Sequence, residues 1–192
     1  PVTDGRLYAV ARIFCVGRNY AAHAAEMGSP VTEAPFWFTK SPFALAPPDG
    51  TLPYPPGTND LHHEVELVLA LGAPLFRAAA DQARAAVWAM AVGLDMTRRD
   101  LQAAAKQARL PWDTAKDFEG SAIIGPLTPG ALEGGGQISL TVNGTVRQDA
   151  PLAEMLRGVE ALLVHLSTLY HLGPGDIVMT GTPAGVGAVG PG

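Results

Sequence analysis

Two glutamates lie two positions apart in the segment LHHEVELVLALG, residues 61–72, which otherwise has the apolar composition of a buried β-strand. Successive side chains of a strand alternate between its two faces, so Glu64 and Glu66 should lie side by side, together with His62. Two partly desolvated carboxylates at that spacing repel each other unless a cation supplies the opposite charge. The pair therefore indicates a divalent metal site, and a solvated polar face on an edge strand is the competing interpretation.

A third carboxylate is needed to complete a set of oxygen ligands. Asp95 ends the apolar segment AVGLD, where a lone buried acid would be costly. Carboxylate oxygens suit Mg²⁺, Mn²⁺ or Ca²⁺ better than zinc, which favours cysteine and histidine. An iron site that includes His62 is a weaker alternative, because His63 points to the opposite face and no second histidine is suitably placed.

A second pair of functional side chains, His23 and Glu26, occurs in the segment RNYAAHAAEMGSP. Its alanine-rich centre predicts a short helix that ends near Gly28 and Pro30, with His23 and Glu26 on one face. Taken alone, such a pair on an exposed helix is an ordinary side-chain contact.

The composition limits the remaining choices of function. The chain has 192 residues, 47% of them hydrophobic, and a net charge of -5, with no run of lysine and arginine that would bind nucleic acid or an anionic membrane. The single cysteine, Cys15, is expected in the core of a cytoplasmic protein, and no apolar stretch is long enough for a membrane span. The tail GVGAVG has no helix after it and is not a dinucleotide site, and no serine lies in a G-x-S-x-G motif.

The elements that must position these residues follow from periodicity and turn signals. One domain of mixed α and β structure is expected, with a loop over the proline-rich residues 41–60 and a hairpin at Asn143-Gly144. Thr97 is the expected N-cap of a helix with Asp100 in its first turn. The expected strands cover residues 6–17, 35–40, 61–72 and 176–183, and the expected longer helices cover residues 78–90, 97–110 and 150–173.

Five segments in this order resemble the fumarylacetoacetate hydrolase family, and within it the acylpyruvate hydrolase branch: HHEVEL, GLDMTRRDLQ, PWDTAKDFEGSAIIGP, VNGTVRQ and PGDIVMTGTPAGVG. CVGRNYAAHAAEMG resembles the lid of that branch, and PFWFTK, DLHHE and GLDMTRRDLQ look closest to fumarylpyruvate hydrolases. The resemblance implies an α+β fold with a mixed, rolled β-sheet core of the family's C-terminal-domain type and short peripheral helices. It also implies one catalytic domain over residues 1–192 and a homodimer. Family members usually continue past GTPAGVG, so the C-terminal end is expected to be shorter here.

The resemblance also implies roles for particular residues. Glu64, Glu66 and Asp95 would hold Mg²⁺ or Mn²⁺, with Ca²⁺ as a non-native occupant, and Lys116 would add positive charge near a developing oxyanion. His23, oriented by Glu26, would take a proton from water. The residues expected to bind the 2-keto acid substrate are Arg18, Asn19 and Lys40 at its carboxylates, and Gln102 and Thr182 at its pyruvyl part.

The implied activity is hydrolysis of the C–C bond of an acylpyruvate. Fumarylpyruvate, cleaved to fumarate and pyruvate in the gentisate route of aromatic degradation, is the favoured substrate. Decarboxylation of oxaloacetate would use the same metal and needs no attacking water. A non-catalytic, metal-stabilised binding protein is the third hypothesis.

Overall fold

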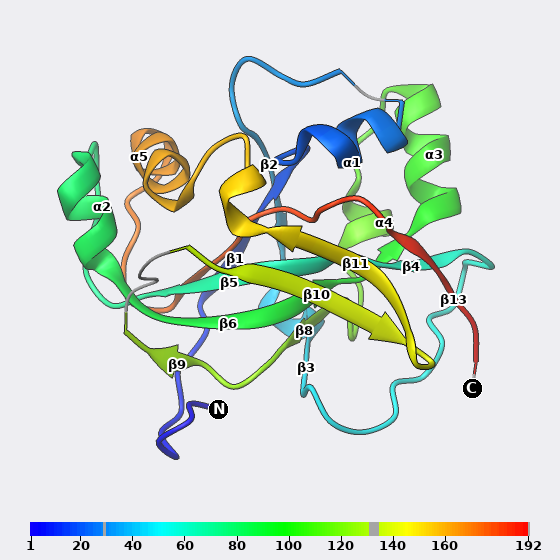
Figure 1. The fold of residues 1–192 in the computed structure, drawn as a ribbon, viewed down its shortest axis with the longest axis horizontal. Coiled ribbons are helices and arrows are strands. Elements are labelled where there is room, and N and C mark those ends of the chain that lie inside the picture. The colour runs from blue at the N-terminus through cyan, green and yellow to red at the C-terminus, as the bar shows by residue number, and fades with distance from the viewer. Residues whose placement is uncertain (29, 131–134, 192) are drawn as a thin grey trace.

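The centre of the fold is a mixed β-sheet with the spatial order β2-β1-β12-β5-β6-β8-β3, and β9 is paired to β6 (Figure 1). The computed structural model describes residues 1–28, 30–130 and 135–191. The pairs β1–β12 and β3–β8 are parallel, and the other neighbours are antiparallel. The strands of this sheet are β1 (Arg12–Gly17), β2 (Phe36–Lys40), β3 (Leu45–Ala46), β5 (Val65–Leu71), β6 (Val87–Asp95), β8 (Ala122–Ile124), β9 (Thr128–Pro129) and β12 (Asp176–Met179).

Two smaller sheets and a few short helices complete the architecture. The hairpin of β10 (Gln137–Val142) and β11 (Thr145–Pro151) crosses the main sheet, and β13 (Gly187–Val189), β4 (Leu61–His63) and β7 (Thr97–Arg98) form a three-stranded sheet (Figure 1). The helices are α1 (Ala21–Glu26), α2 (Ala80–Ala86), α3 (Arg99–Ala108), α4 (Asp113–Lys116) and α5 (Val159–Leu169), with 3₁₀ turns η1 (Pro42–Ala44) and η2 (Leu152–Glu154). The curled mixed sheet with short helices confirms the predicted α+β class. Among the described residues no helix has the length and apolar character that crossing a membrane requires.

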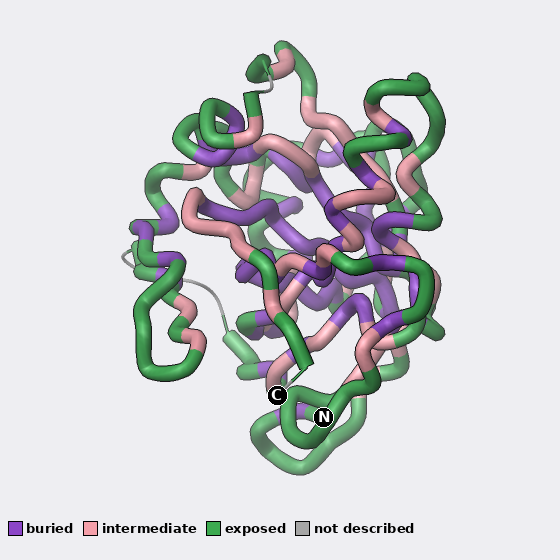
Figure 2. The backbone as a smooth tube through the Cα atoms, turned by 90° about the vertical axis from the view of Figure 1, so that its right-hand side faces the viewer, coloured by how far each residue is buried: buried purple, intermediate pink, exposed green. Residues whose placement is uncertain are grey.

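Two apolar layers pack on the two faces of the central strand β5. Leu67, Leu69 and Leu71 point into one layer, where they meet Leu163 and Leu166 of α5. Each such leucine contributes about 1.5–3 kcal/mol through burial. The buried positions follow the central strands of the sheet (Figure 2).

The opposite layer is built from the alternate residues of β5. It contains Val68 and Ala70, and Ala89 and Ala91 reach it from β6. Cys15 of β1 lies there too, fully buried, as the sequence predicted. Because side chains alternate along a strand, Glu66 and Asp95 belong to this same face of the sheet.

The hairpin and several other elements confirm the sequence-based predictions. Asn143 and Gly144 both have positive φ, 51° and 78°, as a two-residue hairpin turn of the primed type requires. Asp100 lies in the first turn of α3, where it accepts a hydrogen bond from the Thr58 hydroxyl. The short helix α1 and the strand β2 also lie where they were predicted, and β12 begins at the predicted residue Asp176.

Several boundaries differ from the predictions. The strand predicted over residues 61–72 is divided at Glu64 into β4 and β5, which belong to different sheets, and the strand predicted over residues 176–183 ends at Met179. Residues 6–11 form no strand, since β1 begins at Arg12, and the helix predicted over residues 78–90 ends at Ala86. Ala89 of this segment and Ala91 just beyond it belong to β6 and are buried in the second apolar layer. The last helix begins at Val159 rather than near residue 150, because η2 and a bend precede it. Thr97 does not cap α3; its hydroxyl donates to the Asp95 carbonyl and accepts from Lys116.

Candidate metal centre

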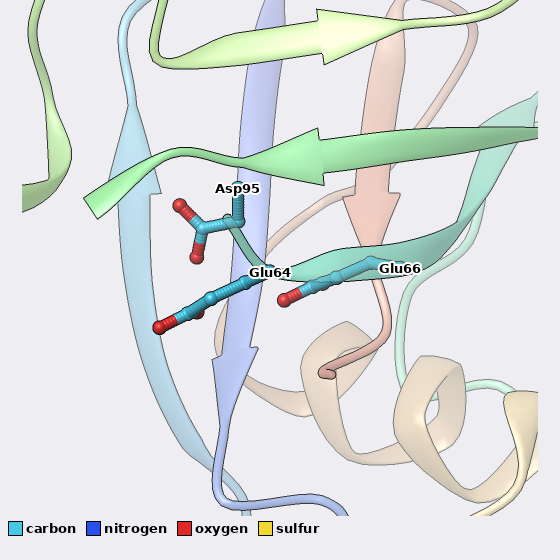
Figure 3. Close-up of side chains that lie close together, drawn as sticks. All are labelled: Glu64, Glu66 and Asp95. Carbon is cyan, nitrogen blue, oxygen red and sulfur yellow. The ribbon is translucent and has the colours of Figure 1, made fainter. Parts of the chain in front are cut away.

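Three carboxylates converge at the point where β5 and β6 run side by side (Figure 3). Glu66 lies in β5, Glu64 immediately precedes that strand, and Asp95 ends β6. All three residues are at most 4% exposed, and one oxygen from each lies within 4.8 Å of those of the other two. The metal-binding arrangement predicted from the sequence is therefore present, and the alternative of a solvated face on an edge strand is wrong, because β5 is a central strand.

The backbone explains why the three side chains meet. The Asp95 amide donates to the Glu64 carbonyl over 2.8 Å, which holds the two acids next to each other. Gly93 is the cross-strand partner of Glu66 and shares its face of the sheet. A Cβ at Gly93 would lie 2.7 Å from Val68 and 2.9 Å from the Ile123 carbonyl. Glycine at this position therefore allows β6 to lie close to Val68 and to the backbone of β8, directly across from Glu66.

Three buried cations surround two of the three acids. Lys116 Nζ lies 2.8 Å from Glu64 and 2.6 Å from Asp95, and it also donates to Thr97. Arg99 donates to the other oxygen of Glu64. Lys40 Nζ lies 2.8 Å from Asp95 Oδ1 in an ion pair that lacks the angle of a good hydrogen bond.

Glu66 has no cationic partner among the described residues. Its Oε2 accepts from the Gly181 amide over 2.7 Å, and no hydrogen bond from the described residues reaches Oε1. Burial, together with the neighbouring Asp95 and Glu64, raises the pKa of Glu66 well above its usual range. A cation beside Glu66 would remove this repulsion.

The same site lowers the pKa of Glu64 and raises the pKa of Lys116. Burial alone would raise the pKa of Glu64, but Lys116 and Arg99 outweigh it and hold the pKa far below the usual value. Burial alone would lower the pKa of Lys116, but Asp95 and Glu64 raise it above the usual value. Both groups are thus charged at neutral pH. The donor set of three carboxylates without cysteine fits Mg²⁺ or Mn²⁺.

The second functional pair lies at the entrance to this site. His23 Nδ1 is 3.3 Å from Glu26 Oε2 on α1, and the Gly185 amide donates to both oxygens of Glu26, over 3.1 and 3.2 Å. Burial lowers the pKa of His23, although Glu64 and Glu26 raise it. The imidazole is therefore neutral near pH 7 and able to accept a proton.

A small open cleft, with a cavity volume of about 30 Å³, lies between the three acids and His23. Of the residues predicted to bind substrate, Arg18, Gln102 and Thr182 line it, together with the three acids, His23 and Lys116. The side-chain oxygen of Gln102, Oε1, accepts from Arg99 over 2.6 Å, and the Thr182 hydroxyl accepts from Gln148 over 2.7 Å.

Two predicted substrate-binding residues do not line the cleft. The Asn19 amide is committed to the backbone, since it donates to the carbonyls of Arg157 and Thr180 and accepts from the Arg157 amide. Lys40 lies behind Asp95, where its amine also donates to the carbonyl of Lys116. The structure gives these two side chains structural contacts in place of the predicted contact with a substrate carboxylate.

The structure adds residues that the sequence did not single out. Arg99 contacts Glu64 and Gln102, and Thr97 binds Lys116. Gln148 is buried, accepts from His63 Nδ1 and the Val65 amide, and donates to Thr182 and the Pro183 carbonyl. Arg99 lies within the motif GLDMTRRDLQ, so its position next to Asp95 was a usable signal.

The fold and the three-carboxylate site together define a family. The model of the fumarylacetoacetate (FAA) hydrolase C-terminal domain matches residues 12–192, and the chain belongs to this family. The chain is 46% identical over 168 residues to a fumarylpyruvate hydrolase of Ralstonia sp, covering 85% of this chain and 88% of the relative. It is 41% identical over 184 residues to an oxaloacetate tautomerase of Escherichia coli (strain K12), covering 94% and 84%.

A solved structure confirms the fold that the resemblance implied. The crystal structure of fumarylpyruvate hydrolase from Pseudomonas aeruginosa in complex with Mn²⁺ and pyruvate matches with a TM-score of 0.91 and 45% identity. The match covers 97% of this chain and 83% of that chain. That neighbour holds an ion of the type predicted for Glu64, Glu66 and Asp95.

Proposed function

We propose that this chain hydrolyses an acylpyruvate, and that fumarylpyruvate, cleaved to fumarate and pyruvate, is its preferred substrate. The observation that carries the proposal is the buried triad of Glu64, Glu66 and Asp95, which faces the same cleft as the pair of His23 and Glu26. The first group suits a metal-chelating 2-keto acid, and the second suits activation of water. The relatives named as fumarylpyruvate hydrolases support the choice of substrate.

The triad would hold Mg²⁺ or Mn²⁺, and Ca²⁺ would be a non-native occupant. When bound, the ion supplies a Lewis acid for the keto oxygen and for the negative charge of a leaving pyruvate enolate. Arg99, Lys116 and Lys40 fix the orientation of Glu64 and Asp95. The three N–H groups of Lys116 are already engaged, so its contribution is positive charge near the reacting oxygens and the positioning of the acids.

His23 is the base in this proposal. Its neutral imidazole takes a proton from water as the water oxygen attacks the carbonyl carbon distant from the pyruvyl end. The bond between that carbon and the pyruvyl methylene then breaks, and the methylene carbon receives the proton that His23 holds. Glu26, fixed by the Gly185 amide, orients the imidazole and stabilises its protonated form. Arg18, Gln102 and Thr182 are the proposed substrate-binding residues.

Conversion of oxaloacetate is the second candidate function. Relatives at 41% and 39% identity, from Escherichia coli and Arabidopsis thaliana, are named oxaloacetate tautomerases. Decarboxylation of oxaloacetate requires the enolate-stabilising site but no attacking water, whereas tautomerisation also requires a base that moves a proton between carbon and oxygen. Hydrolysis and decarboxylation therefore differ in their need for His23.

Ultraviolet turnover assays distinguish these functions. The protein is offered fumarylpyruvate, acetylpyruvate and oxaloacetate, each with Mg²⁺ or Mn²⁺ and again after EDTA. Metal-dependent loss of fumarylpyruvate with equimolar release of pyruvate supports the hydrolase. Turnover of oxaloacetate alone overturns it. A metal-dependent rise in melting temperature without turnover of any 2-keto acid would favour a metal-stabilised binding protein.

We also propose a domain organisation, an oligomeric state and a cellular compartment for the enzyme. Residues 1–192 would act as one catalytic domain in a cytoplasmic homodimer that serves the gentisate route, with a small 2-keto acid as partner. The buried, unpaired Cys15 agrees with a reducing compartment. Light scattering during size-exclusion chromatography tests the dimer directly.

A further inference from the structure

Two further cations lie along the cleft. Lys106 has no role predicted from the sequence, and Arg18 was predicted to bind a substrate carboxylate. Lys106 and Arg18 both line it and are half-buried, and no acidic side chain among the described residues forms an ion pair with either. This distinguishes them from Arg99, Lys116 and Lys40, each of which binds an acid of the metal site. Their charges are therefore available to an anionic ligand.

Each of the two cations lies next to an aromatic ring, which does not neutralise its positive charge. Lys106 Nζ lies 5.1 Å from the centroid of Trp112, and the guanidinium carbon of Arg18 lies 5.9 Å from that of Phe36. These two rings meet edge to face at 4.9 Å, so the cations rest on one continuous aromatic cluster. Trp112 also lines the cleft, where it offers a flat wall to a conjugated chain.

Arg18 is strained as well as unpaired. It has a φ of 61°, uncommon for a residue with a side chain, and its buried Nε finds no hydrogen-bond partner in the described part of the chain. Only a long contact of 3.5 Å joins its Nη1 to the Pro30 carbonyl. Strain and an unsatisfied donor at a cleft are typical of a binding site.

Helix α3 places Lys106 at a defined distance from the metal site. Arg99, Gln102 and Lys106 follow one another at spacings of three and four and all line the cleft, so they share one face of the helix. Arg99 contacts Glu64, and Lys106 lies seven residues further along, a helical rise of roughly 10 Å. In an extended acylpyruvate with a second carboxylate, five bonds of about 1.5 Å or less separate the keto carbon from that carboxylate. A ligand held at the metal site and aligned with this face of α3 would extend towards Lys106.

We infer that Lys106, together with Arg18, forms a subsite for the second carboxylate of a dicarboxylic acylpyruvate and thereby selects it over acylpyruvates with an apolar end. This inference rests on the proposed function, because it needs the 2-keto acid end of the ligand anchored at the triad. It assigns Lys106 a role in substrate choice, whereas the metal site and His23 serve the bond cleavage common to all acylpyruvates.

A binding experiment tests the subsite without relying on turnover. Calorimetry of the Mn²⁺-loaded protein compares 2-oxopimelate with 2-oxoheptanoate, which differ only in the distal carboxylate. The wild-type protein is expected to bind 2-oxopimelate about tenfold more tightly, the size of one charge-assisted hydrogen bond at a partly exposed site. Lys106→Gln should remove that preference while leaving the affinity for 2-oxoheptanoate unchanged, and Lys106→Arg should restore it. Arg109→Gln, at the exposed end of the same helix, is the control for net charge.

Kinetics separate this inference from the proposed function. Lys106→Gln should raise KM for fumarylpyruvate about tenfold and leave KM and kcat for acetylpyruvate unchanged. A wild-type protein that prefers 2-oxopimelate but cleaves no acylpyruvate would overturn the hydrolase and leave the subsite standing. Equal affinity of the wild-type protein for the two ligands would overturn the subsite. So would an Arg109→Gln effect as large as that of Lys106→Gln.

Discussion

Replacing Glu66 by glutamine tests the metal site most directly, because Glu66 is the acid of the triad that has no cationic partner in the described structure. The substitution keeps the size of the side chain and an oxygen that accepts from the Gly181 amide. It breaks no ion pair and removes a charge whose pKa burial and two neighbouring acids raise. The metal-free variant should therefore be as stable as the wild type or slightly more stable, within about 1 kcal/mol.

Glu66→Gln should weaken metal binding much more than it changes the stability of the metal-free protein. At an ion concentration of about 100 times Kd, binding stabilises the native state by about 2.7 kcal/mol. For a chain of this size that corresponds to a rise in Tm of about 5–10 °C. If losing one of three anionic ligands weakens binding about a hundredfold, the same ion concentration stabilises the variant by only about 0.4 kcal/mol, or about 1 °C.

The assay is thermal unfolding with and without Mn²⁺, supported by urea unfolding of the EDTA-treated protein. Glu64→Gln is the matched control, since it also removes a ligand but leaves Arg99 and Lys116 without their shared partner. Breaking a buried ion pair from one side costs about 3–5 kcal/mol, so Glu64→Gln should destabilise the metal-free protein as well. The reasoning is refuted if Glu66→Gln keeps the full rise in Tm on adding metal, or if both variants destabilise the metal-free protein equally.

Three further predictions concern the base and Gly93, the strand partner of Glu66. His23→Ala should abolish hydrolysis of fumarylpyruvate but spare any decarboxylation of oxaloacetate; equal loss of both activities in the turnover assay would contradict its assignment as the base. Because burial lowers the pKa of His23 from its ordinary 6.5, kcat/KM of the Mn²⁺-saturated enzyme should stay high as the pH falls to 6.5. It should be lost only below that value, as the imidazole becomes protonated. Glu26→Gln should move this acidic limb lower still, because Glu26 raises the pKa of His23, and a pH–rate profile with an unmoved limb would count against the pairing. Gly93→Ala should cost about 1–3 kcal/mol by overpacking against Val68 and the Ile123 carbonyl. It should also weaken Mn²⁺ binding by displacing the strand partner of Glu66, as measured by urea unfolding and calorimetry; unchanged Mn²⁺ affinity would show that the close approach at Gly93 does not position Glu66.

Local patterns were sufficient to predict the acids of the site. Alternation along a strand places Glu64 and Glu66 together, and the energetic cost of a lone buried acid singles out Asp95. The turn chemistry of Asn143-Gly144 likewise predicts the hairpin, because it depends on residues adjacent in the chain. The alanine-rich segment of residues 78–90 shows the limit of such reasoning. From Val87 onward its residues form the strand β6, because pairing with β5 and burial in the sheet override their helix propensity.

Lys116 was predicted at the site from the resemblance, and it pairs there with Glu64 and Asp95. The places of Arg99 and Lys40 could not be assigned from the sequence, because they depend on how distant elements dock. Arg98 and Arg99 are neighbours, yet Arg99 reaches Glu64 while Arg98 donates to the Thr114 carbonyl. Which of the two turns inward depends on the angle at which α3 leaves β7. Lys40 was expected at the substrate, but the pairing of β2 with β1 carries it behind Asp95. Gln148 reaches the site only because the hairpin folds across β5.

The balance of charge links the metal to the choice of substrate. Glu64, Glu66 and Asp95 are offset by Arg99, Lys116 and Lys40, so the buried part of the site carries no net charge with all six groups ionised. A divalent ion makes it doubly positive, and Arg18 and Lys106 add two unpaired charges along the cleft. A 2-keto acid with one carboxylate offsets only part of this excess, whereas a second carboxylate at the far end meets the two cations there. The same excess stabilises the enolate that forms when the C–C bond breaks, so the charges that favour a dicarboxylic substrate also favour its cleavage.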